Sequence, residues 1–288
     1  MDEKNKKLRD LIEEEDPIVI PACIDAFSAK MVDKAGFQAN YLSGNGVSAT
    51  TLGQPDIGLV TMSQMTSICS NIVKATNIPL IADADTGYGN ALNVIRTVQE
   101  LETAGVSCIQ LEDQITPKHC GHFPGTKPVV PIDEQLGKLK AALDTRIDNN
   151  LLIIARTDAA AEHGIEEAIK RATLFEEAGA DLTFIEIEGS AKDFENISRN
   201  VPGKYATTVD ESRKEPAFTV EELGEMGFKL IIFPGIVRCT YLKAISDILD
   251  TLKNENSVES KKHLMSTFKE YNELLGKEHF DKLTKKYL

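Results

Sequence analysis

The sequence lacks paired cysteines. Its five cysteines are odd in number, widely scattered and without a C-x-x-C pair, which argues against a disulfide framework and a structural zinc site. A zinc site built from His119, Cys120 and His122 would crowd adjacent ligands and leave no fourth partner. We therefore expect reduced thiols. Four of them are predicted to be small buried side chains, namely Cys23, Cys69, Cys108 and Cys239.

Long hydrophobic runs and an excess of basic residues are also missing. No run approaches the roughly 18 apolar residues of a membrane helix, and the charged residues 1–10 lack the apolar core of a signal peptide. The 45 acidic and 32 basic residues give a net charge of −13, which argues against a nucleic-acid partner. We expect a cytoplasmic protein that binds neither membranes nor nucleic acid. An acidic small substrate would need local cations or a metal.

Eight short, apolar, β-branched runs recur along the 288 residues, with helix-like segments such as 90–104 and 164–178 between most of them. The runs cover residues 17–22, 39–43, 79–85, 106–113, 151–158, 182–188, 204–208 and 229–235. Near-continuous apolar strands in eight strand–helix units are typical of a parallel (β/α)8 TIM barrel. A doubly wound open sheet is the main alternative.

The C-terminal part holds more helix than one closing barrel helix needs. We assign residues 1–240 to the barrel core and 241–288 to charged amphipathic helices, one of them over 257–275. The apolar positions of that helix recur at helical spacing and are Leu264, Phe268, Tyr271, Leu274 and Leu275. Such a stripe usually packs within its own subunit, but an appended helical pair often packs on a neighbour, so we expect an oligomer.

Several predicted strands end in acids. Asp83 and Asp85 lie on one face of their strand, and Glu112 ends the next. The carboxyl ends of barrel strands meet at one mouth, where three carboxylates would repel unless they shared a cation. Oxygen ligands with room for water suit Mg²⁺ or Mn²⁺. The alternative is that these acids cap helices through the turn at residues 86–89.

Residues 117–122 place a thiol, Cys120, between His119 and His122 and close to Lys118. Lys118 and a protonated imidazole would favour the thiolate, so this cysteine is a candidate reactive group in an exposed loop. The alternative is a polar loop with an inert free cysteine.

Two further polar sites are open to more than one interpretation. Residues 41–46 offer a hydroxyl, an amide and backbone donors that suit a keto-acid oxygen, although an ordinary turn would also use Gly and Asn. Arg156 lies in an apolar strand, and its guanidinium needs a partner, either a substrate carboxylate or an acid such as Glu186 or Glu188.

Taken together, six segments resemble the isocitrate lyase and phosphoenolpyruvate mutase superfamily, most closely its short lyases, 2-methylisocitrate lyase and 2,3-dimethylmalate lyase. They are Tyr-Leu-Ser-Gly at 41–44, Gly-Gln-Pro-Asp-Ile-Gly at 53–58, Asp-Ala-Asp-Thr-Gly-Tyr-Gly at 83–89, Gln-Leu-Glu-Asp-Gln at 110–114, Lys-His-Cys-Gly-His at 118–122 and Ala-Arg-Thr-Asp at 155–158. The resemblance implies a barrel whose last helix is exchanged between subunits, commonly in a homotetramer, with Mg²⁺ at its mouth.

The resemblance also implies a role for each matching residue. Asp85 would coordinate the metal directly or through water. Asp56, Asp83 and Glu112 would hold the waters of the metal. The keto-acid half of the substrate would bind to Ser43, Gly44 and Asn45. A substrate carboxylate would bind to Arg156, with His122 and Gly121. Glu186 and Arg238 match further substrate-binding positions of the family, and Lys118 and His122 belong to the catalytic loop motif.

The implied reaction breaks a carbon–carbon bond beside a 2-hydroxy acid and leaves pyruvate and a second carboxylic acid. Tyr41 is the family-matched base for the hydroxyl proton, although its ordinary pKa of about 10 would need lowering by the metal. Cys120 would then protonate the other fragment as general acid, because a thiol with a pKa of about 8.5 is mostly protonated at neutral pH. The loop over residues 115–131 would close over the substrate.

Two positions depart from the family pattern. His119 stands where the lyases carry Lys or Arg, and Thr208 stands where methylisocitrate lyases have an asparagine that helps hold substrate carboxylates. A smaller dicarboxylate substrate therefore stays open beside a tricarboxylate. The alternative functions are oxaloacetate decarboxylation or hydrolysis, phosphonate mutase or hydrolase chemistry, and a non-catalytic barrel that binds a keto acid.

Overall fold

The computed structural model describes residues 3–187, 189–209, 211 and 218–288. Eight parallel strands form a closed barrel in sequence order, and β1 pairs with β8 from Ile18 opposite Leu230 to Pro21 opposite Phe233. The strands are β1 (Ile18–Cys23), β2 (Asn40–Leu42), β3 (Leu80–Asp83), β4 (Cys108–Glu112), β5 (Leu152–Thr157), β6 (Leu182–Ile185), β7 (Tyr205–Thr208) and β8 (Phe228–Phe233). The predicted TIM barrel is confirmed, and the open sheet is wrong.

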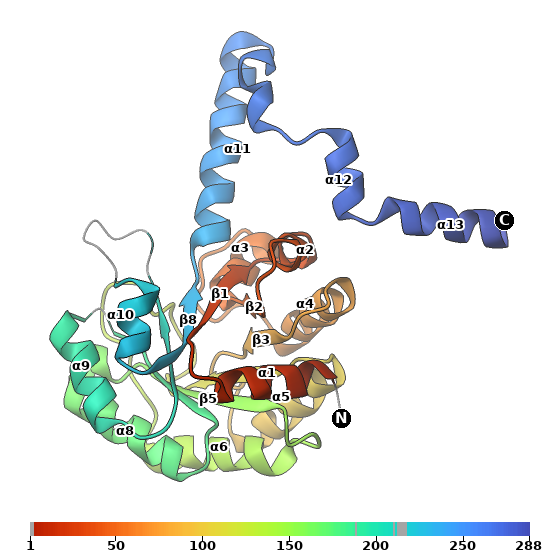
Figure 1. Cartoon of the computed structure of the whole chain (residues 1–288). Coiled ribbons are helices and arrows are strands. Elements are labelled where there is room, and N and C mark those ends of the chain that lie inside the picture. Colours follow the sequence, from red (N-terminus) through yellow and green to blue (C-terminus); the bar gives the residue numbers. More distant parts are fainter. Residues whose placement is uncertain (1–2, 188, 210, 212–217) are drawn as a thin grey trace.

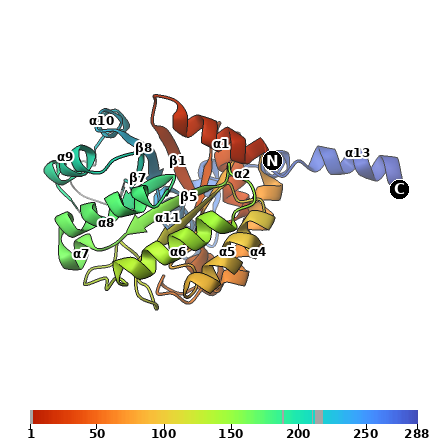
Figure 2. The same ribbon diagram turned by 90° about the horizontal axis from the view of Figure 1, so that it is seen from below.

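Helices surround the barrel on its outer face (Figures 1 and 2). They are α2 (Ala26–Lys34), α3 (Gly44–Leu52), α4 (Met62–Ala75), α5 (Ala91–Thr103), α6 (Ile132–Thr145), α7 (Ala160–His163), α8 (Ile165–Glu177), α9 (Ala191–Asn200) and α10 (Val220–Glu225). The predicted helices at 90–104 and 164–178 correspond to α5 and α8. Asn90 caps α5 by accepting from Leu92 N, which explains why that helix begins where it does.

The first helix, α1 (Glu3–Glu13), covers the end of the barrel where the strands begin. Its apolar face buries Leu8, Leu11 and Ile12 against the side chains that fill the barrel. Arg9 donates to Asp181 at 2.8 Å, just before β6. Because this end is closed by α1, the chemistry is left to the opposite end, as in other TIM barrels.

The C-terminal part forms an arm that extends away from the barrel in Figure 1; in Figure 2 α11 lies behind the barrel and the end of the arm with α13 projects beyond it. It comprises α11 (Ile236–Glu255), a 3₁₀ turn η1 (Glu259–Leu264), α12 (Phe268–Leu274) and α13 (Lys277–Tyr287). Tyr271 touches α2 through Phe27, with ring centroids 5.8 Å apart. The expected boundary between residues 240 and 241 lies within α11, and the division into two domains stays a prediction.

Two expectations about the arm are wrong. A single helix over 257–275 does not form, because Asn256 ends α11 in the left-handed conformation and Thr267 starts α12 through a capping box with Glu270. Cys239 is exposed rather than buried, because it lies on α11 where that helix leaves the barrel. The other three cysteines predicted to be buried are buried. Of the helices in the described ranges, none is long and apolar enough to cross a membrane.

Candidate active site

Residues 115–131, between β4 and α6, form a lid that folds over the mouth of the barrel. An antiparallel bridge joins Gln114 to Val129 at its base, and Ile115 N donates to Pro128 O at 2.8 Å. These contacts make the lid an ordered loop with a narrow neck. The lid therefore holds residues 118–122 in a defined position relative to the barrel.

The lid docks on residues 53–58, the Gly-Gln-Pro-Asp-Ile-Gly segment. Cys120 N donates to Asp56 O at 3.0 Å, and Lys118 Nζ donates to Asp56 Oδ2 at 2.8 Å. Gly58 has a φ of +76°, and a Cβ there would lie 3.2 Å from Lys118 N. A glycine at this position lets the two loops meet backbone to backbone.

Four carboxylates surround the buried ammonium of Lys118, namely Asp56, Asp83, Asp85 and Glu112. Its Nζ lies 2.7 Å from Asp85 Oδ1 in addition to its contact with Asp56. Burial alone would lower the pKa of Lys118, but the four acids together raise that pKa well above its ordinary value. Burial raises the pKa of Asp85 to about 7 despite the neighbouring ammonium, and it raises the pKa of Glu112 well above its usual range.

This cluster suits a hydrated magnesium ion better than a cage of direct ligands. Glu112 Oε1 is buried and accepts no hydrogen bond from any residue in the described ranges. Within those ranges, no three His, Cys, Asp or Glu side chains are arranged to ligate one ion together. Mg²⁺ usually keeps several waters and is held by one or two carboxylates. The donor set fits an ion held through Asp85, with water between the ion and the other acids.

The lid and the strand ends enclose a cavity of about 30 Å³, roughly the space of one water molecule. Its walls are Tyr41, Ser43, Asn45, Asp56, Asp83, Glu112, Lys118, Cys120, Gly121, His122, Arg156, Glu186, Thr208, Pro234 and Arg238. The structure thus brings the site residues expected from sequence to one cavity, except Gly44 and Asp85, which lie behind its wall.

Cys120 is buried, with 7% of its surface exposed, and its sulfur accepts a hydrogen bond from Asn45 Nδ2 at 3.3 Å. Burial raises the pKa of the thiol, and the Asn45 hydrogen bond offsets only part of this rise. The expected exposed, thiolate-favouring loop is therefore wrong. His119 is exposed, with its backbone N held by Gln114 Oε1 at 2.9 Å, so it lies outside the cavity.

Strand β2 delivers Tyr41 to the cavity and ends beside the acid cluster. Burial, followed by the charge of Asp83, raises the pKa of Tyr41 well above its ordinary value. Ser43 then begins α3, and Gly44 N donates to Asp83 Oδ2 at 3.3 Å. A Cβ at Gly44 would lie 3.1 Å from Asp85 Oδ1, so the position needs a glycine to pack on the acids.

Arg156 at the end of β5 is held by acids of this chain. Its Nε and Nη2 donate to the two oxygens of Asp158 at 3.0 and 2.8 Å, and Nη2 lies 3.2 Å from Glu186. Glu112 is 3.6 Å from Nε. Glu186, one of the two partners proposed from sequence, is thus in place, and Glu188 lies outside the described residues. Asp158 was not expected as a partner of Arg156, although residues i and i+2 of a strand share a face.

The far wall carries Thr208, Pro234 and Arg238. Arg238 Nη1 donates to Pro234 O at 2.9 Å, which holds the guanidinium over the end of β8. Pro234 was not expected in the site. It directly follows β8, and the carboxyl ends of barrel strands meet at the mouth, so its position at the strand end could have indicated it.

A larger cavity of about 630 Å³ lies on the outer side of the lid and shares Gly121, His122 and Glu186 with the inner cavity. A Cβ at Gly121 would lie 2.5 Å from Arg156 Nη2 and 2.7 Å from Glu186 Cδ. Gly121 therefore lies between the two cavities, at a position too close to Arg156 and Glu186 for a larger residue. Movement of the lid would join the inner cavity to the outer one.

Known proteins resemble this chain in sequence and in fold. The family model described as phosphoenolpyruvate phosphomutase matches residues 8–253. The chain belongs to the phosphoenolpyruvate mutase and isocitrate lyase superfamily. Among relatives of this superfamily member, 2,3-dimethylmalate lyase of Eubacterium barkeri is 42% identical over 281 residues, which cover 98% of this chain and 97% of the relative.

Solved structures of the superfamily agree with the barrel and the lid. An oxaloacetate acetylhydrolase in complex with 3,3-difluorooxalacetate has a TM-score of 0.91 and 34% identity, covering 97% of this chain and 95% of that chain. A phosphonopyruvate hydrolase in complex with oxalate and Mg²⁺ has a TM-score of 0.89 and 29% identity over 99% of both chains. The predicted superfamily is confirmed, and this member is a carbon–carbon lyase of the isocitrate lyase type.

Proposed function

We propose that the enzyme uses Mg²⁺, with Mn²⁺ as a substitute, to cleave a substituted 2-hydroxy acid to pyruvate and a second carboxylic acid. The substrate is of the 2,3-dimethylmalate or 2-methylisocitrate type. One observation carries the proposal: the buried thiol of Cys120 lines the same cavity as Arg156 and the strand-end acids. A proton donor, a carboxylate ligand and a cation site thus meet where a small hydroxy acid would react.

The metal would be held by Asp85, with Asp56, Asp83 and Glu112 binding its waters. Bound there, Mg²⁺ would supply Lewis-acid stabilisation of the charge that develops on the keto-acid oxygens. The phosphonopyruvate hydrolase structure, with its oxalate and Mg²⁺, supports this assignment by similarity.

Tyr41 and Cys120 would move the two protons of the reaction. Tyr41, as its phenolate, would accept the hydroxyl proton. The carbon–carbon bond then breaks, and the electron pair of that bond stays on the carbon beside the departing carboxylate. Cys120 then gives its S–H proton to that carbon and becomes a thiolate. Because burial raises the pKa of Cys120, the group is held as the acid that this step requires. The raised pKa of Tyr41 means that the base needs positive charge nearby to act.

Substrate carboxylates would bind at two places on the cavity wall. In the family-based assignment the keto-acid half is held by Ser43, Gly44 and Asn45, of which Ser43 and Asn45 line the cavity. Arg156 with His122 and Gly121 would hold the carboxylate of the other fragment. Arg238 and Thr208 line the far wall, where a hydroxyl replaces the amide of methylisocitrate lyases. Because Thr208 lacks the amide with which methylisocitrate lyases hold substrate carboxylates, a dicarboxylate of the dimethylmalate type is favoured over a tricarboxylate.

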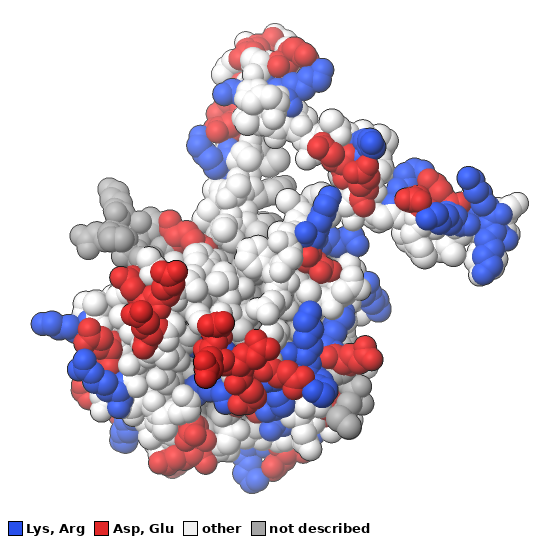
Figure 3. All heavy atoms as spheres, viewed as in Figure 1, with Lys and Arg blue, Asp and Glu red and all other residues white. Residues whose placement is uncertain are grey.

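The arm would pack on a neighbouring subunit in a homotetramer, with α11 as the exchanged helix. Several of its large apolar side chains are exposed, among them Tyr241, Leu242, Leu249, Leu264 and Phe268. In Figure 3 the part of α11 that leaves the barrel is largely uncharged. Large apolar side chains exposed along α11 and the rest of the arm support association with a second copy of the chain.

Oxaloacetate hydrolysis is the second candidate. It is favoured by the likeness to oxaloacetate acetylhydrolase, which has a TM-score of 0.91 with this chain. In that reaction water would add to the keto carbon, the carbon–carbon bond would break, and the departing two-carbon fragment would take up a proton at carbon, so the products would be oxalate and acetate instead of pyruvate.

The test is to assay release of pyruvate, glyoxylate and oxalate from 2,3-dimethylmalate, 2-methylisocitrate, isocitrate and oxaloacetate with Mg²⁺. We expect pyruvate from a substituted malate or isocitrate, and Cys120→Ala should lower kcat by roughly 10²- to 10⁴-fold, the usual contribution of a general acid. Near wild-type turnover of Cys120→Ala would remove the assigned role of the thiol. Cleavage of oxaloacetate alone would favour the second candidate, and no turnover of any substrate would leave the non-catalytic alternative.

A further inference from the structure

Asn45 is the second residue of α3, and its side chain reaches across the cavity to the lid. Nδ2 donates to Cys120 Sγ at 3.3 Å. The residue is half-buried, and it lies on the barrel body while its partner lies on the lid. The family resemblance assigns Asn45 to the keto-acid half of the substrate, but in this structure its amide N–H points at sulfur.

This hydrogen bond, together with a backbone hydrogen bond from His122 to the sulfur, limits where the thiol proton can point. A thiol has a single proton, and its sulfur can accept hydrogen bonds as well. With Asn45 donating to sulfur, the S–H does not point at the Asn45 amide and is left to point into the cavity. Once the proton has been transferred, the same N–H faces a thiolate, and hydrogen bonds to charged acceptors are stronger than those to neutral ones.

The charged groups next to Cys120 in the sequence do not take this position. The Lys118 ammonium is bound to Asp56 and Asp85 at 2.8 and 2.7 Å, and the His119 side chain is exposed. A neutral amide at the sulfur leaves the thiol protonated before reaction, whereas an ammonium there would favour the thiolate from the start. The arrangement is therefore suited to a proton donor rather than a nucleophile.

We propose that Asn45 is a positioning residue for Cys120, which directs the S–H toward the substrate carbon and stabilises the thiolate that remains. This inference rests on the proposed role of Cys120 as general acid, and it replaces the assignment of Asn45 to the keto acid. It also gives the lid a polar contact with α3 at the reacting atom itself.

The first test is a series of variants at this position, each assayed for kcat and KM with Mg²⁺ and the cleaved substrate. Asn45→Ala removes the donor and should lower kcat by about 10- to 100-fold, the value of a hydrogen bond to a charged group. Asn45→Asp keeps the size but faces sulfur with a carboxylate, so its kcat should fall further. Asn45→Gln restores an N–H and should recover part of kcat. Equal losses in all three variants, or an unchanged kcat in Asn45→Ala, would overturn the inference.

The second test separates a role at sulfur from a role at the substrate. Binding of pyruvate to the Mg²⁺-loaded enzyme, measured by calorimetry, should change by less than about 3-fold in Asn45→Ala. In a Cys120→Ala background, Asn45→Ala should cause no further loss of kcat, because the group that it positions is gone. Weaker pyruvate binding by about 10-fold or more would instead assign Asn45 to the keto acid.

Thr51→Ala provides the matched control, because Thr51 is exposed on the same helix, α3. It should leave kcat, KM and pyruvate binding as they are in the wild type. Two failures can be told apart. If Cys120→Ala keeps its turnover, the proposed function fails. If Cys120→Ala is inactive while Asn45→Ala keeps its kcat, only the positioning role fails.

Discussion

Asp158 holds the guanidinium of Arg156 through two hydrogen bonds, of 3.0 Å from Nε and 2.8 Å from Nη2. Both residues are buried, and Asp158 has no exposed surface. The Asp158 backbone N in turn donates to Asp113 Oδ1 at 3.0 Å, and Asp113 Oδ2 accepts from Arg171 at 3.0 Å. The guanidinium that faces the cavity is thus fixed by a chain of buried polar contacts that reaches α8.

Asp158→Asn should therefore weaken substrate turnover without touching the substrate itself. The amide keeps one acceptor but loses the paired, charge-assisted contact, so the guanidinium is free to shift toward Glu186. A misplacement of about 1 Å costs roughly 10²-fold in rate at such sites, and we expect kcat/KM to fall by about that factor. Steady-state kinetics and urea unfolding would measure the effect, with a loss of stability of about 1–3 kcal/mol.

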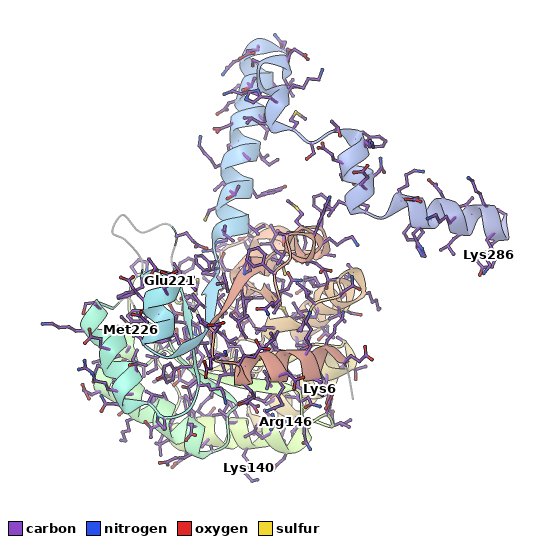
Figure 4. All side chains as sticks on the ribbon, in the orientation of Figure 1. Lys6, Lys140, Arg146, Glu221, Met226 and Lys286 are labelled. Carbon is purple, nitrogen blue, oxygen red and sulfur yellow. The ribbon has the colours of Figure 1, made fainter. Side chains whose placement is uncertain are left out.

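The control for this variant is Asp144→Asn on α6. Asp144 pairs with Lys140 at 2.8 Å, but both side chains are largely exposed, and Lys140 stands on the outer surface in Figure 4. An exposed pair of this kind contributes about 0–1 kcal/mol. Equal changes of kcat/KM in Asp144→Asn and Asp158→Asn would contradict the role of the buried Asp158 in fixing the Arg156 guanidinium.

Tyr205 on β7 allows a test of stability against pH. Burial raises the pKa of Tyr205, and its hydroxyl donates to Ser198 O at 3.2 Å. A group whose pKa is raised on folding gives stability that is complete below its unfolded pKa, about 10 for tyrosine, and that is lost as pH rises through the folded pKa. Tyr205→Phe should cost about 1 kcal/mol at pH 7. The difference in unfolding free energy between the wild type and Tyr205→Phe should become smaller as the pH rises above about 10.

Urea unfolding at pH 7, 9 and 11 would measure that gap. Tyr287→Phe is the control, because Tyr287 is 68% exposed on α13. The unfolding free energy of Tyr287→Phe should equal that of the wild type at each pH. A Tyr205→Phe gap that grew with pH would show the opposite sign of linkage and would contradict the raised pKa.

Part of the site was predictable from sequence, because several buried strands are apolar runs that carry a polar residue at or near their carboxyl end. Asp83, Glu112 and Arg156 all lie where that pattern places them. The closed position of the lid was not predictable. It depends on the ion pair between Lys118 and Asp56, residues 62 apart in sequence, and burial of Cys120 follows from that contact. The break before Thr267, between η1 and α12, was missed because the apolar positions Leu264, Phe268 and Tyr271 recur at helical spacing across it.

Gly121→Ala should prevent full closure of the lid. The added Cβ would lie 2.5 Å from Arg156 Nη2, so either the lid or the guanidinium must move. We expect kcat/KM to fall by at least about 10²-fold, because the lid carries the general acid. Limited proteolysis should cut the lid faster than in the wild type, while the rest of the chain keeps its stability.

Gly137→Ala is the matched substitution on α6, where a Cβ would meet no atom within 4 Å. It should leave kinetics unchanged and stabilise the helix by roughly 0.5–1 kcal/mol, the helix preference of Ala over Gly. Wild-type kinetics in Gly121→Ala would mean that the outer and inner cavities are not separated during turnover.

Glu112→Gln should weaken metal binding. Glu112 Oε1 is buried and accepts no hydrogen bond from the described residues, which leaves it free for a metal-bound water. Loss of such an outer-shell contact typically costs about 10- to 100-fold in metal affinity. Calorimetric titration of the chelator-treated enzyme with Mn²⁺ would measure it, and Glu100→Gln on the exposed face of α5 should bind as the wild type does. Equal affinity in the two variants would place the ion elsewhere.

Leu242→Asp combined with Leu249→Asp should dissociate the proposed tetramer. These leucines are 68% and 57% exposed on α11, so a charge there costs little in a single subunit but much in an apolar interface. Light scattering after size exclusion should show a lower mass than for the wild type. Leu92→Asp on α5 replaces a leucine that is 74% exposed on the barrel, and it should leave the mass unchanged. A double variant with wild-type mass would mean that α11 faces water in the assembled protein.

Because Arg238 lies in the first turn of the same helix, dissociation should also lower kcat/KM, and it would do so through the position of α11 rather than through any contact of Leu242 with substrate.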